Sequence, residues 1–475
     1  MFYYRKAELA KMMAVYQDPR PQAIAIYGRR RTGKSELIQE SFRQTPNIRH
    51  FYYLCGSDTY LGNLLGFANE LAAYLGVASS LLPTFSSFRQ VFVYFRPYFA
   101  TSKMLIAIDE FPYLTKKKNG AEVAHEFQAI IEQDLAPTQV SLILCGSEVR
   151  YMKEVCESYD SPLYGRFREI LVVNPFTYSE VAPLFPKFTP FEILATYAAT
   201  GGVAAYVFYF KDYPTFQAAI VALFLSPSAR LLDEPQAILA AEFTAPAVYG
   251  ALLKRLAPKP APMSSLVSAI GLPLSSLYPY LEKLKVMGLV QEYATAFSEK
   301  QRDVFYYISD PFFRFAYGFI DPHRSQIGLC DSSLLFNDIF NEEALHTFLG
   351  HIYEDAIVKR LLMELGLAHR LPFLPSVILP WRGQVKNGKG EVGESEIDVV
   401  AYDATHIIFG ECKAKKQPLG LATYRELLAK IPFVPSGRRQ PQILLASFSG
   451  FTPEVLALAN QGVLLVAGTT LLNAH

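Results

Sequence analysis

The stretch that most constrains this chain is the segment 28–35, which reads Gly-Arg-Arg-Arg-Thr-Gly-Lys-Ser. The apolar residues 23–27 before it predict a buried strand, and residues 36–40 after it are good helix formers. Two glycines at this spacing, followed by lysine and serine, are typical of a loop that wraps its backbone N–H groups around an anion. Because the strand and the helix flank the segment in the required order, we interpret it as a phosphate-binding loop and not as a chance match in a surface loop.

Each residue type in this loop suits contact with ATP. The glycines let the backbone approach a phosphate because no Cβ intervenes, and the N-terminus of the following helix adds partial positive charge. Lys34 is predicted to contact the β- and γ-phosphates, and Ser35 to offer its hydroxyl to Mg²⁺. The predicted nucleotide-binding residues are Gly28, Arg29, Arg30, Arg31, Thr32, Gly33, Lys34 and Ser35.

Composition narrows the class of protein. The chain has 475 residues, which is too many for one core and favours three or four domains. Its net charge of +1 provides no overall attraction to nucleic acid or membrane, so any such site must be local. The five cysteines include no Cys-x-x-Cys pair, which argues against a zinc site or a disulfide framework. With no secretory pattern and no apolar run as long as a membrane span, we expect a cytoplasmic protein without a membrane partner.

A second apolar stretch, residues 104–108, ends in Asp109 and Glu110. An apolar strand that ends in two acids is a Walker B motif when a phosphate-binding loop precedes it. We expect Asp109 to hold Mg²⁺ through water, and Glu110 to orient and activate the attacking water. The alternative is a buried strand with a solvated acidic end.

A third predicted strand, residues 140–147, ends in Ser147. This residue is either a sensor of the γ-phosphate at the strand end or the N-cap of the next helix. The alternation of strands and helices predicts an α/β fold with a mostly parallel sheet covered on both faces. In such sheets the ligand binds at the carboxyl ends of the strands.

Several of these segments resemble the archaeal-type ATPase family, an AAA+-like member of the STAND group of P-loop NTPases. The motifs that carry the resemblance are residues 28–35, Ile-Asp-Glu-Phe-Pro-Tyr-Leu at 108–114, Cys-Gly-Ser at 145–147, Ser-Pro-Leu-Tyr-Gly-Arg at 161–166, and Thr-Gly-Gly-Val-Ala-Ala-Tyr at 200–206. The resemblance implies that Arg166 contacts the γ-phosphate, within one chain or across two; a surface salt bridge is the alternative. The sequence departs from the family at its N-terminus, where Tyr4 and Lys6 flank Arg5 in place of acidic residues.

Residues 176–240 are rich in helix formers and predict a helical lid over the nucleotide. From residue 241 to about 325 the pattern predicts three helices and a β-hairpin, the order of a winged helix-turn-helix. Ser275 or Ser276 is expected to cap its third helix, and Gly288 to end it. Residues 241–310 contain seven lysines and arginines and six acids. A net charge this small provides little attraction for the phosphates of DNA. This segment therefore either binds DNA or serves as an interdomain or protein contact.

The resemblance continues into the last part of the chain. Ser309–Phe315 is a hallmark of the family, and it leads into a C-terminal domain, 326–475, similar to the PD-(D/E)XK nuclease fold. Asp398 lies near the start of one predicted strand, and Glu411 and Lys413 lie on the next. Residues i and i+2 of a strand share a face, so these three side chains are expected to converge.

The convergent residues predict a metal-dependent phosphodiesterase site. Asp398 and Glu411 would hold Mg²⁺ or Mn²⁺, and Lys413 would position or activate a water. Glu354, on a preceding helix, is the fourth expected member, and Glu396 is a less favoured ligand. A surface ion-pair ladder on an inactive fold is the alternative. Basic residues that would line a nucleic-acid path, or form a solvated face, are Lys415, Lys416, Arg438 and Arg439.

Together these features predict an α/β chain of four parts: a P-loop ATPase domain (1–175), a helical lid (176–240), a winged helix-turn-helix (241–325) and a restriction-endonuclease-like domain (326–475). The function expected is an ATP-hydrolysing switch coupled to a DNA-directed nuclease-like module. The alternative is a regulatory or scaffolding ATPase with an inactive nuclease-like domain. The expected partners are ATP, DNA, and a protein partner or second copy of the chain.

Overall fold

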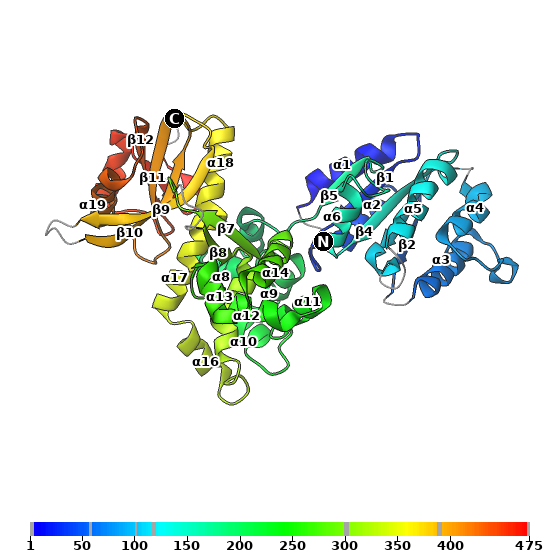
Figure 1. Cartoon of the computed structure of the whole chain (residues 1–475), viewed down its shortest axis with the longest axis horizontal. Helices are drawn as coiled ribbons and strands as arrows, with labels where there is room; N and C mark the ends of the chain where they lie inside the picture. The colour runs from blue at the N-terminus through cyan, green and yellow to red at the C-terminus, as the bar shows by residue number, and fades with distance from the viewer. Residues whose placement is uncertain are drawn as a thin grey trace. The chain divides into compact units, whose positions relative to one another are not determined.

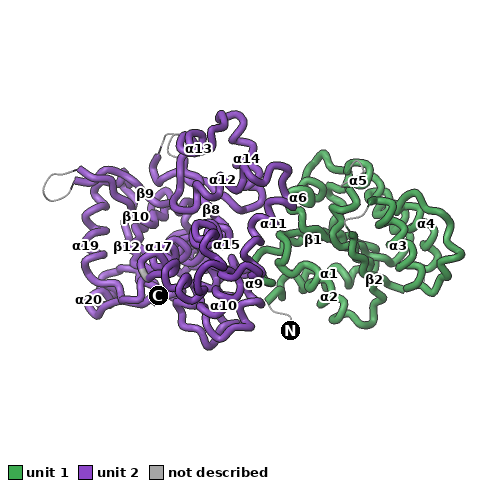
Figure 2. Tube along the Cα trace, turned by 90° about the horizontal axis from the view of Figure 1, so that it is seen from below, with its two compact units in different colours: residues 1–175, 203–205 green, residues 176–202, 206–475 purple. Residues whose placement is uncertain are grey.

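The computed structural model describes residues 4–56, 59–99, 102–115, 120–298, 304–386 and 392–472. The chain folds into two compact units (Figure 2). The first comprises residues 1–175 together with 203–205, and the second comprises 176–202 and 206–475. Within the described ranges, no helix has the length and apolar character needed to cross a membrane.

The first unit is built on a five-stranded sheet in the order β2-β3-β4-β1-β5. Figure 1 labels β1, β2, β4 and β5 of this sheet. All neighbouring strands pair in parallel, as the sequence predicted. The bounds of the strands are β1 (Ala23–Tyr27), β2 (Arg49–Leu54), β3 (Met104–Asp109), β4 (Val140–Gly146) and β5 (Glu169–Val172). β1, β3 and β4 are buried along their whole length, which explains their continuous apolar sequence.

Apolar residues of β1 alternate between two hydrophobic clusters. Ile24 and Ile26 belong to one cluster, and Ala25 and Tyr27 belong to the other. The two clusters therefore pack on opposite faces of the sheet, and helices cover both. The helices of this unit are α1 (Lys6–Gln17), α2 (Lys34–Arg43), α3 (Tyr60–Leu75), η1 (Ser79–Leu81), α4 (Phe88–Phe99), η2 (Phe111–Leu114), α5 (Gly120–Ala129), η3 (Ile130–Asp134) and α6 (Val149–Glu157).

The second unit starts with a helical region and continues with three helices and a hairpin, in the order that the sequence predicted. The helices are α7 (Tyr178–Val181), η4 (Ala182–Leu184), α8 (Pro190–Thr200), α9 (Ala204–Phe210), α10 (Phe216–Phe224), α11 (Glu234–Glu242), α12 (Pro246–Leu256), α13 (Met263–Ile270) and α14 (Leu274–Val286). A small antiparallel sheet follows, with β8 (Val304–Ile308) between β6 (Ala261–Pro262) and β7 (Val290–Ala294).

The prediction that a serine caps α14 is wrong. Pro273 is the N-cap, and the helix begins at Leu274, before both Ser275 and Ser276. A proline fixes φ near −65°, which suits the approach to a helix without a side-chain cap. The C-terminal end agrees with the prediction, because Gly288 has a left-handed φ of 70° directly after the C-cap residue Met287.

The rest of the second unit contains a six-stranded mixed sheet in the order β14-β13-β12-β11-β10-β9. β11 pairs in parallel with β12 and antiparallel with β10. The strands are β9 (Val377–Lys386), β10 (Val392–Tyr402), β11 (His406–Lys413), β12 (Gln440–Ser447), β13 (Leu464–Ala467) and β14 (Thr470–Leu471). The helices are α15 (Pro311–Phe315), η6 (Ala316–Ile320), η7 (Asp321–His323), α16 (Ser332–Ile339), α17 (Glu342–Ile352), η8 (Tyr353–Val358), α18 (Lys359–Leu367), α19 (Leu421–Lys430), η9 (Ile431–Phe433), α20 (Pro453–Leu456) and η10 (Ala457–Gln461).

Two successive glycines in the motif 200–206 adopt left-handed backbone conformations. Gly201 has φ 58° and ends α8, and Gly202 has φ 68°. The Gly202 carbonyl accepts a hydrogen bond from the Phe176 N–H at 2.7 Å. A Cβ on Gly202 would collide with the Phe176 backbone carbonyl. Only glycine fits this position, because both the φ angle and the close backbone approach exclude a side chain.

We therefore expect Gly202→Ala to lower the free energy of unfolding of the second unit by about 3 kcal/mol. The matched control is Gly271→Ala, where φ is also positive at 76° but a Cβ would meet no atom within 4 Å. That change should cost only about 1 kcal/mol. Urea unfolding can be followed by the fluorescence of Trp381, which is the single tryptophan of the chain and lies in the second unit. Equal losses in the two variants would contradict this account.

Candidate functional site

The loop between β1 and α2 has the geometry of an anion-binding turn. Gly33 has φ 93° and is the N-cap of α2. A Cβ on Gly28 would clash with the backbone carbonyl of Val173, so this position also requires glycine. The Lys34 ammonium donates hydrogen bonds to the carbonyls of Gly28 and Arg29, both at 2.9 Å. The lysine therefore lies across the loop, where the phosphates of a nucleotide would replace the two carbonyls as its partners.

Ser35 and Asp109 meet although they lie 74 residues apart in sequence. The Ser35 hydroxyl donates to Asp109 Oδ2 at 2.5 Å, and the Tyr52 hydroxyl donates to the same oxygen at 2.6 Å. Burial and the Asp109 carboxylate raise the pKa of Tyr52, so its hydroxyl stays a proton donor. A hydroxyl and a carboxylate converge here from two loops, and both are oxygen ligands of the kind that Mg²⁺ prefers. Their arrangement fits the predicted magnesium site.

Glu110 has a strained backbone and a defined side-chain partner. Its φ of 54° is unusual for a residue other than glycine. The Ser147 hydroxyl donates to Glu110 Oε1, and the Ser147 N–H donates to Oε2 at 3.3 Å. Ser147 is not the N-cap of α6, because Glu148 occupies that position. The structure thus brings the expected water-activating acid and the expected sensor residue together at the carboxyl ends of β3 and β4.

Two residues outside the predicted set contact this site. Arg5 is buried and donates hydrogen bonds to the carbonyl oxygens of Thr32 at 3.2 Å and Asn174 at 2.5 Å. Through the Thr32 carbonyl, Arg5 contacts the phosphate loop. The residues that flank Arg5 depart from the family pattern. The sequence did not predict a role for Tyr52, because an aromatic residue on a predicted strand is ordinarily assigned to the hydrophobic core. Only the pairing of β2 with β3 places it beside Asp109.

The remaining predicted nucleotide-binding residues have partners within the first unit. Arg30 lies 3.4 Å from the Tyr113 hydroxyl, and the Arg31 carbonyl accepts a hydrogen bond from the Ala205 N–H at 3.2 Å. The Thr32 hydroxyl donates to the Arg29 carbonyl at 2.9 Å and closes the turn. Arg166 forms an ion pair with Glu132. The alternative reading of Arg166 as a salt bridge therefore describes this structure, and its contact with a γ-phosphate stays a prediction.

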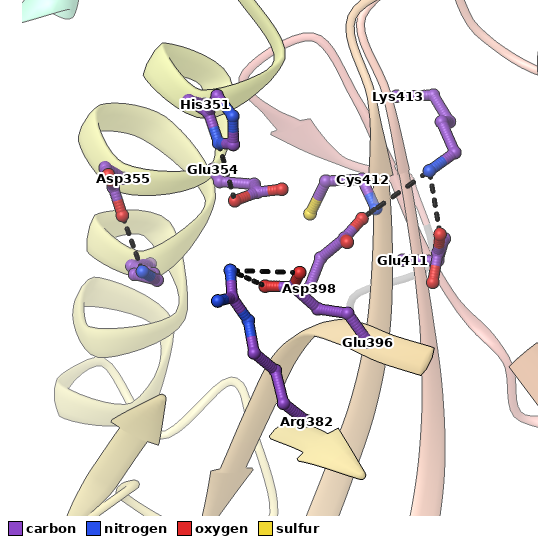
Figure 3. A network of polar contacts seen from close by, with 10 residues as sticks. His351, Glu354, Asp355, Arg382, Glu396, Asp398, Glu411, Cys412 and Lys413 are labelled. Carbon is purple, nitrogen blue, oxygen red and sulfur yellow. Dashed lines mark hydrogen bonds and ion pairs between the residues drawn. The ribbon is translucent and has the colours of Figure 1, made fainter. Parts of the chain in front are cut away.

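The second cluster lies in the C-terminal sheet and combines the residues predicted for it (Figure 3). Lys413 Nζ lies 2.7 Å from Glu411 Oε1 and 3.7 Å from Asp398 Oδ2. Asp398 also accepts a hydrogen bond from the Cys412 N–H at 2.8 Å. The expectation that Asp398 lies near the start of its strand is wrong: β10 begins at Val392, and Asp398 lies at a register shift in its middle. A β-bulge of this kind re-aims a side chain and is common beside active sites.

The two carboxylates of this cluster are mostly buried, with 16% of Asp398 and 8% of Glu411 exposed. Burial and the neighbouring Glu411 raise the pKa of Asp398 to about 6. Burial opposes the charge of Lys413, but the two carboxylates outweigh it and raise the pKa of this lysine. Lys430, which was not predicted, lies 3.3 Å from Glu411 Oε2. It comes from the last turn of α19, so spacing along the strands gave no signal for it.

Glu354 lies across from Asp398 on the helical segment η8 (Figure 3). This segment is a π-helix between α17 and α18, a local widening that is frequent at functional sites. Burial and the Asp398 carboxylate raise the pKa of Glu354 well above its usual range. The structure therefore brings all four predicted residues of the second cluster to one place.

No group of three or more histidine, cysteine or acidic side chains is arranged to hold a metal ion in the part of the chain that the structure describes. Metal binding by Asp398 and Glu411 stays a prediction from the sequence. Two of the predicted basic residues have aromatic partners: Lys416 lies over Phe191, and Arg439 lies over Tyr402. The contact with Tyr402 of β10 indicates that Arg439 stabilises the fold of the C-terminal sheet.

Family models match segments in both the N-terminal and the C-terminal part of the chain. Residues 2–210 match the family model described as "ATPase domain predominantly from Archaea". Residues 316–425 match a second model, described as "Archaea bacterial proteins of unknown function". An uncharacterized protein of Methanocaldococcus jannaschii is 30% identical over 412 residues, which cover 85% of this chain and 84% of that protein.

A solved structure shares the fold over about two thirds of this chain. The Walker-type ATPase of Pyrococcus abyssi aligns with 66% of this chain and 96% of its own, at 20% identity and a TM-score of 0.50. The ORC2 protein of Aeropyrum pernix, solved as ADPNP–ADP complexes, aligns with 73% of this chain and 94% of its own, at 12% identity and a TM-score of 0.47. The likeness extends over most of the sequence, and the chain belongs to the archaeal-type ATPase family, with the ATPase domain followed by the C-terminal domain of that family.

Proposed function

We propose that the protein is a Mg²⁺-dependent, ATP-hydrolysing switch. The observation that carries this proposal is the convergence of the phosphate loop with Asp109 and Glu110. Lys34 lies over the loop, and Ser35 lies 2.5 Å from Asp109. Mg²⁺ bound by Ser35 and Asp109 would neutralise charge that develops on the phosphates.

The protein residues have distinct tasks in this proposal. The loop amides and Lys34 bind and orient the β- and γ-phosphates, and Glu110 accepts a proton from the attacking water. Ser147 holds the Glu110 carboxylate through two hydrogen bonds. A γ-phosphate that engages Ser147 would release Glu110 toward the water. Ser147 thus links nucleotide contact to the position of the catalytic acid.

The second unit would provide the output of the switch. We propose that residues 241–325 form a winged helix and that the C-terminal domain is a nuclease-like module acting on DNA. Asp398, Glu411, Lys413 and Glu354 support this candidate, because two carboxylates and a lysine converge on the neighbouring strands β10 and β11. Mg²⁺ commonly binds through one or two carboxylates and completes its coordination with water and substrate phosphate. The competing proposal is a scaffold in which the ion pairs of Lys413 and Lys430 only stabilise the fold.

The first test separates ATP binding from hydrolysis. Lys34→Ala should weaken ATP binding by about a hundredfold or more, because it removes the charge that faces the phosphates. Glu110→Gln should retain binding and lose about 10²- to 10⁴-fold in turnover, because an amide cannot accept the proton of water. Calorimetry and phosphate release measure the two effects. Lys11→Ala is the control, since Lys11 is 57% exposed and lies on α1. A Glu110→Gln variant with the parent rate would remove Glu110 from the mechanism.

A second test concerns the C-terminal cluster. Asp398→Ala should abolish Mn²⁺-dependent cleavage of plasmid DNA, and Lys413→Ala should keep metal binding while losing about a hundredfold in rate. Both variants should hydrolyse ATP normally, because Asp398 and Lys413 lie in the second unit. Glu364→Ala, an exposed residue of α18, is the control. If the parent protein takes up no Mn²⁺ and cuts neither DNA nor RNA, the scaffold proposal is left.

The raised pKa of Asp398 predicts a pH-dependent gain in stability for Asp398→Asn. Because the folded-state pKa of about 6 exceeds the ordinary value of 3.8, the parent loses stability as the pH rises from about 4 to 6. Asparagine does not ionise and can still accept the Cys412 N–H. At pH 8 without metal, the variant should therefore be more stable by about 1–3 kcal/mol, and the difference should vanish below pH 4. Urea unfolding at the two pH values measures it, and a variant less stable than the parent at pH 8 would contradict the prediction.

A further inference from the structure

The second unit contains a cavity of about 480 Å³ beside the Asp398 cluster. Its walls come from the hairpin β7–β8, the residues around α15, the segment η8, and strands β9 and β10. Glu354 and Glu396 border both the cavity and the Asp398 cluster. A volume of this size falls within the range of small-ligand sites in proteins.

The β7–β8 hairpin and the C-terminal sheet, which form walls of the cavity, contact each other directly. The Ala296 N–H, beyond the end of β7, donates to the Pro380 carbonyl of β9 at 2.8 Å. Phe297 stacks on Tyr402 of β10 with ring centroids 4.7 Å apart, and the Arg439 guanidinium lies over both rings. The hairpin is thus bound to the C-terminal sheet by main-chain and aromatic contacts, and the space between them is a built feature of the fold.

Two of the three cations that line the cavity are paired with carboxylates. Lys359 Nζ, at the start of α18, lies 2.5 Å from Asp355 Oδ1 on the preceding segment η8. Arg382 of β9 lies 3.2 Å from Glu396 of β10. These pairs nearly cancel their own charges.

Arg314 is the third cation, and it belongs to the motif Ser309–Phe315. It lines the cavity, is only 7% exposed, and follows two buried phenylalanines, Phe312 and Phe313. Its guanidinium forms no hydrogen bond or ion pair with any residue that the structure describes. Burial lowers the pKa of Arg314, and the carboxylates of Asp355 and Glu354 oppose this from beyond ion-pair distance.

A buried guanidinium without a direct partner is costly, because it has lost water and cannot discharge in a protein. Its planar fork of N–H groups matches the oxygens of a phosphate or carboxylate. The ligand that compensates this charge is therefore an anion, and the phenol rings of Tyr293 and Tyr307 on the cavity wall provide a surface for an aromatic base.

We propose that this cavity binds the terminal phosphate of a nucleotide, either free or at the end of a nucleic-acid strand, with Arg314 as its main ligand. The choice of phosphate over carboxylate rests on the proposed function of the neighbouring cluster, which faces the same space through Glu354. Arg314 then holds one phosphate in the cavity while the Asp398 cluster faces the adjoining part of the strand. The motif Ser309–Phe315 acquires a binding role in this way.

The test is equilibrium dialysis of labelled pTpT against the full chain carrying Lys34→Ala, with EDTA present. The Lys34→Ala change keeps the probe from the phosphate loop, and EDTA prevents cleavage, so binding is measured whether or not the chain is a nuclease. We expect pTpT to bind, Arg314→Gln to weaken binding at least about tenfold, and Arg382→Gln to weaken it about threefold to tenfold. Arg360→Gln is the matched control, because Arg360 is 53% exposed and does not line the cavity.

Competition identifies the source of the phosphate. Thymidine monophosphate that displaces pTpT at equal concentration assigns the cavity to free nucleotides, and weaker displacement assigns it to strand ends. TpT, which lacks the terminal phosphate, should compete poorly, and equal competition by TpT would overturn the proposal. Absence of pTpT binding would overturn it as well. Circular dichroism shows whether each variant is folded. If Arg314→Gln is unfolded, the test rests on Arg382→Gln. A folded Arg382→Gln variant that binds pTpT as tightly as the parent would count against the proposal.

Discussion

The carboxylate of Asp109 organises the first unit, because three separate parts of the chain donate hydrogen bonds to it. Ser35 donates from the start of α2, Tyr52 from β2, and the Glu110 N–H from the residue after β3. Asp109 is only 1% exposed, so these donors replace the water that a buried charge has lost. The same bonds fix the end of the phosphate loop against the sheet. Donors and charges held in fixed positions are the condition for electrostatic stabilisation of phosphoryl transfer.

The second unit surrounds its buried acids with lysines, in addition to the Cys412 N–H that donates to Asp398. Lys413 and Lys430 both contact Glu411, one at each carboxylate oxygen. Asp398 has a raised pKa despite Lys413, because burial and Glu411 outweigh the lysine. Buried acids whose pKa values are raised by burial and by a neighbouring carboxylate are frequent at functional sites. The bulge at Asp398 and the π-helix at Glu354 favour the functional interpretation, since both distort regular elements at the point where the side chains meet.

The sequence predicted the elements and the motif residues better than the contacts between them. Strand–loop–helix order placed Lys34, Ser35, Asp109 and Glu110, because local spacing determines which residues follow a strand end. The positions of Tyr52 and Lys430 could not be predicted, since each depends on how a distant element packs. Arg314 illustrates the same limit: its motif was recognised, but its isolation among buried aromatic rings is a property of the folded unit. The prediction of a serine cap for α14 was wrong for a local reason. Pro273 is the N-cap, and its fixed φ angle suits the residue that precedes a helix.

The segment 203–205 connects the nucleotide site to the second unit through the chain itself. The Ala205 N–H binds the Arg31 carbonyl, and Ala204 lies beside Gly33 of the phosphate loop. Before this segment, Gly201 and Gly202 hold the chain in left-handed turns, and the Gly202 carbonyl is bonded to the Phe176 N–H. Backbone this tightly constrained cannot absorb a displacement by bending locally. A shift of Arg31 on phosphate binding must either break the bond to Ala205 or move residues that belong to the second unit. In the switch that we propose, this segment is the covalent route by which a change at the phosphate loop would reach the second unit.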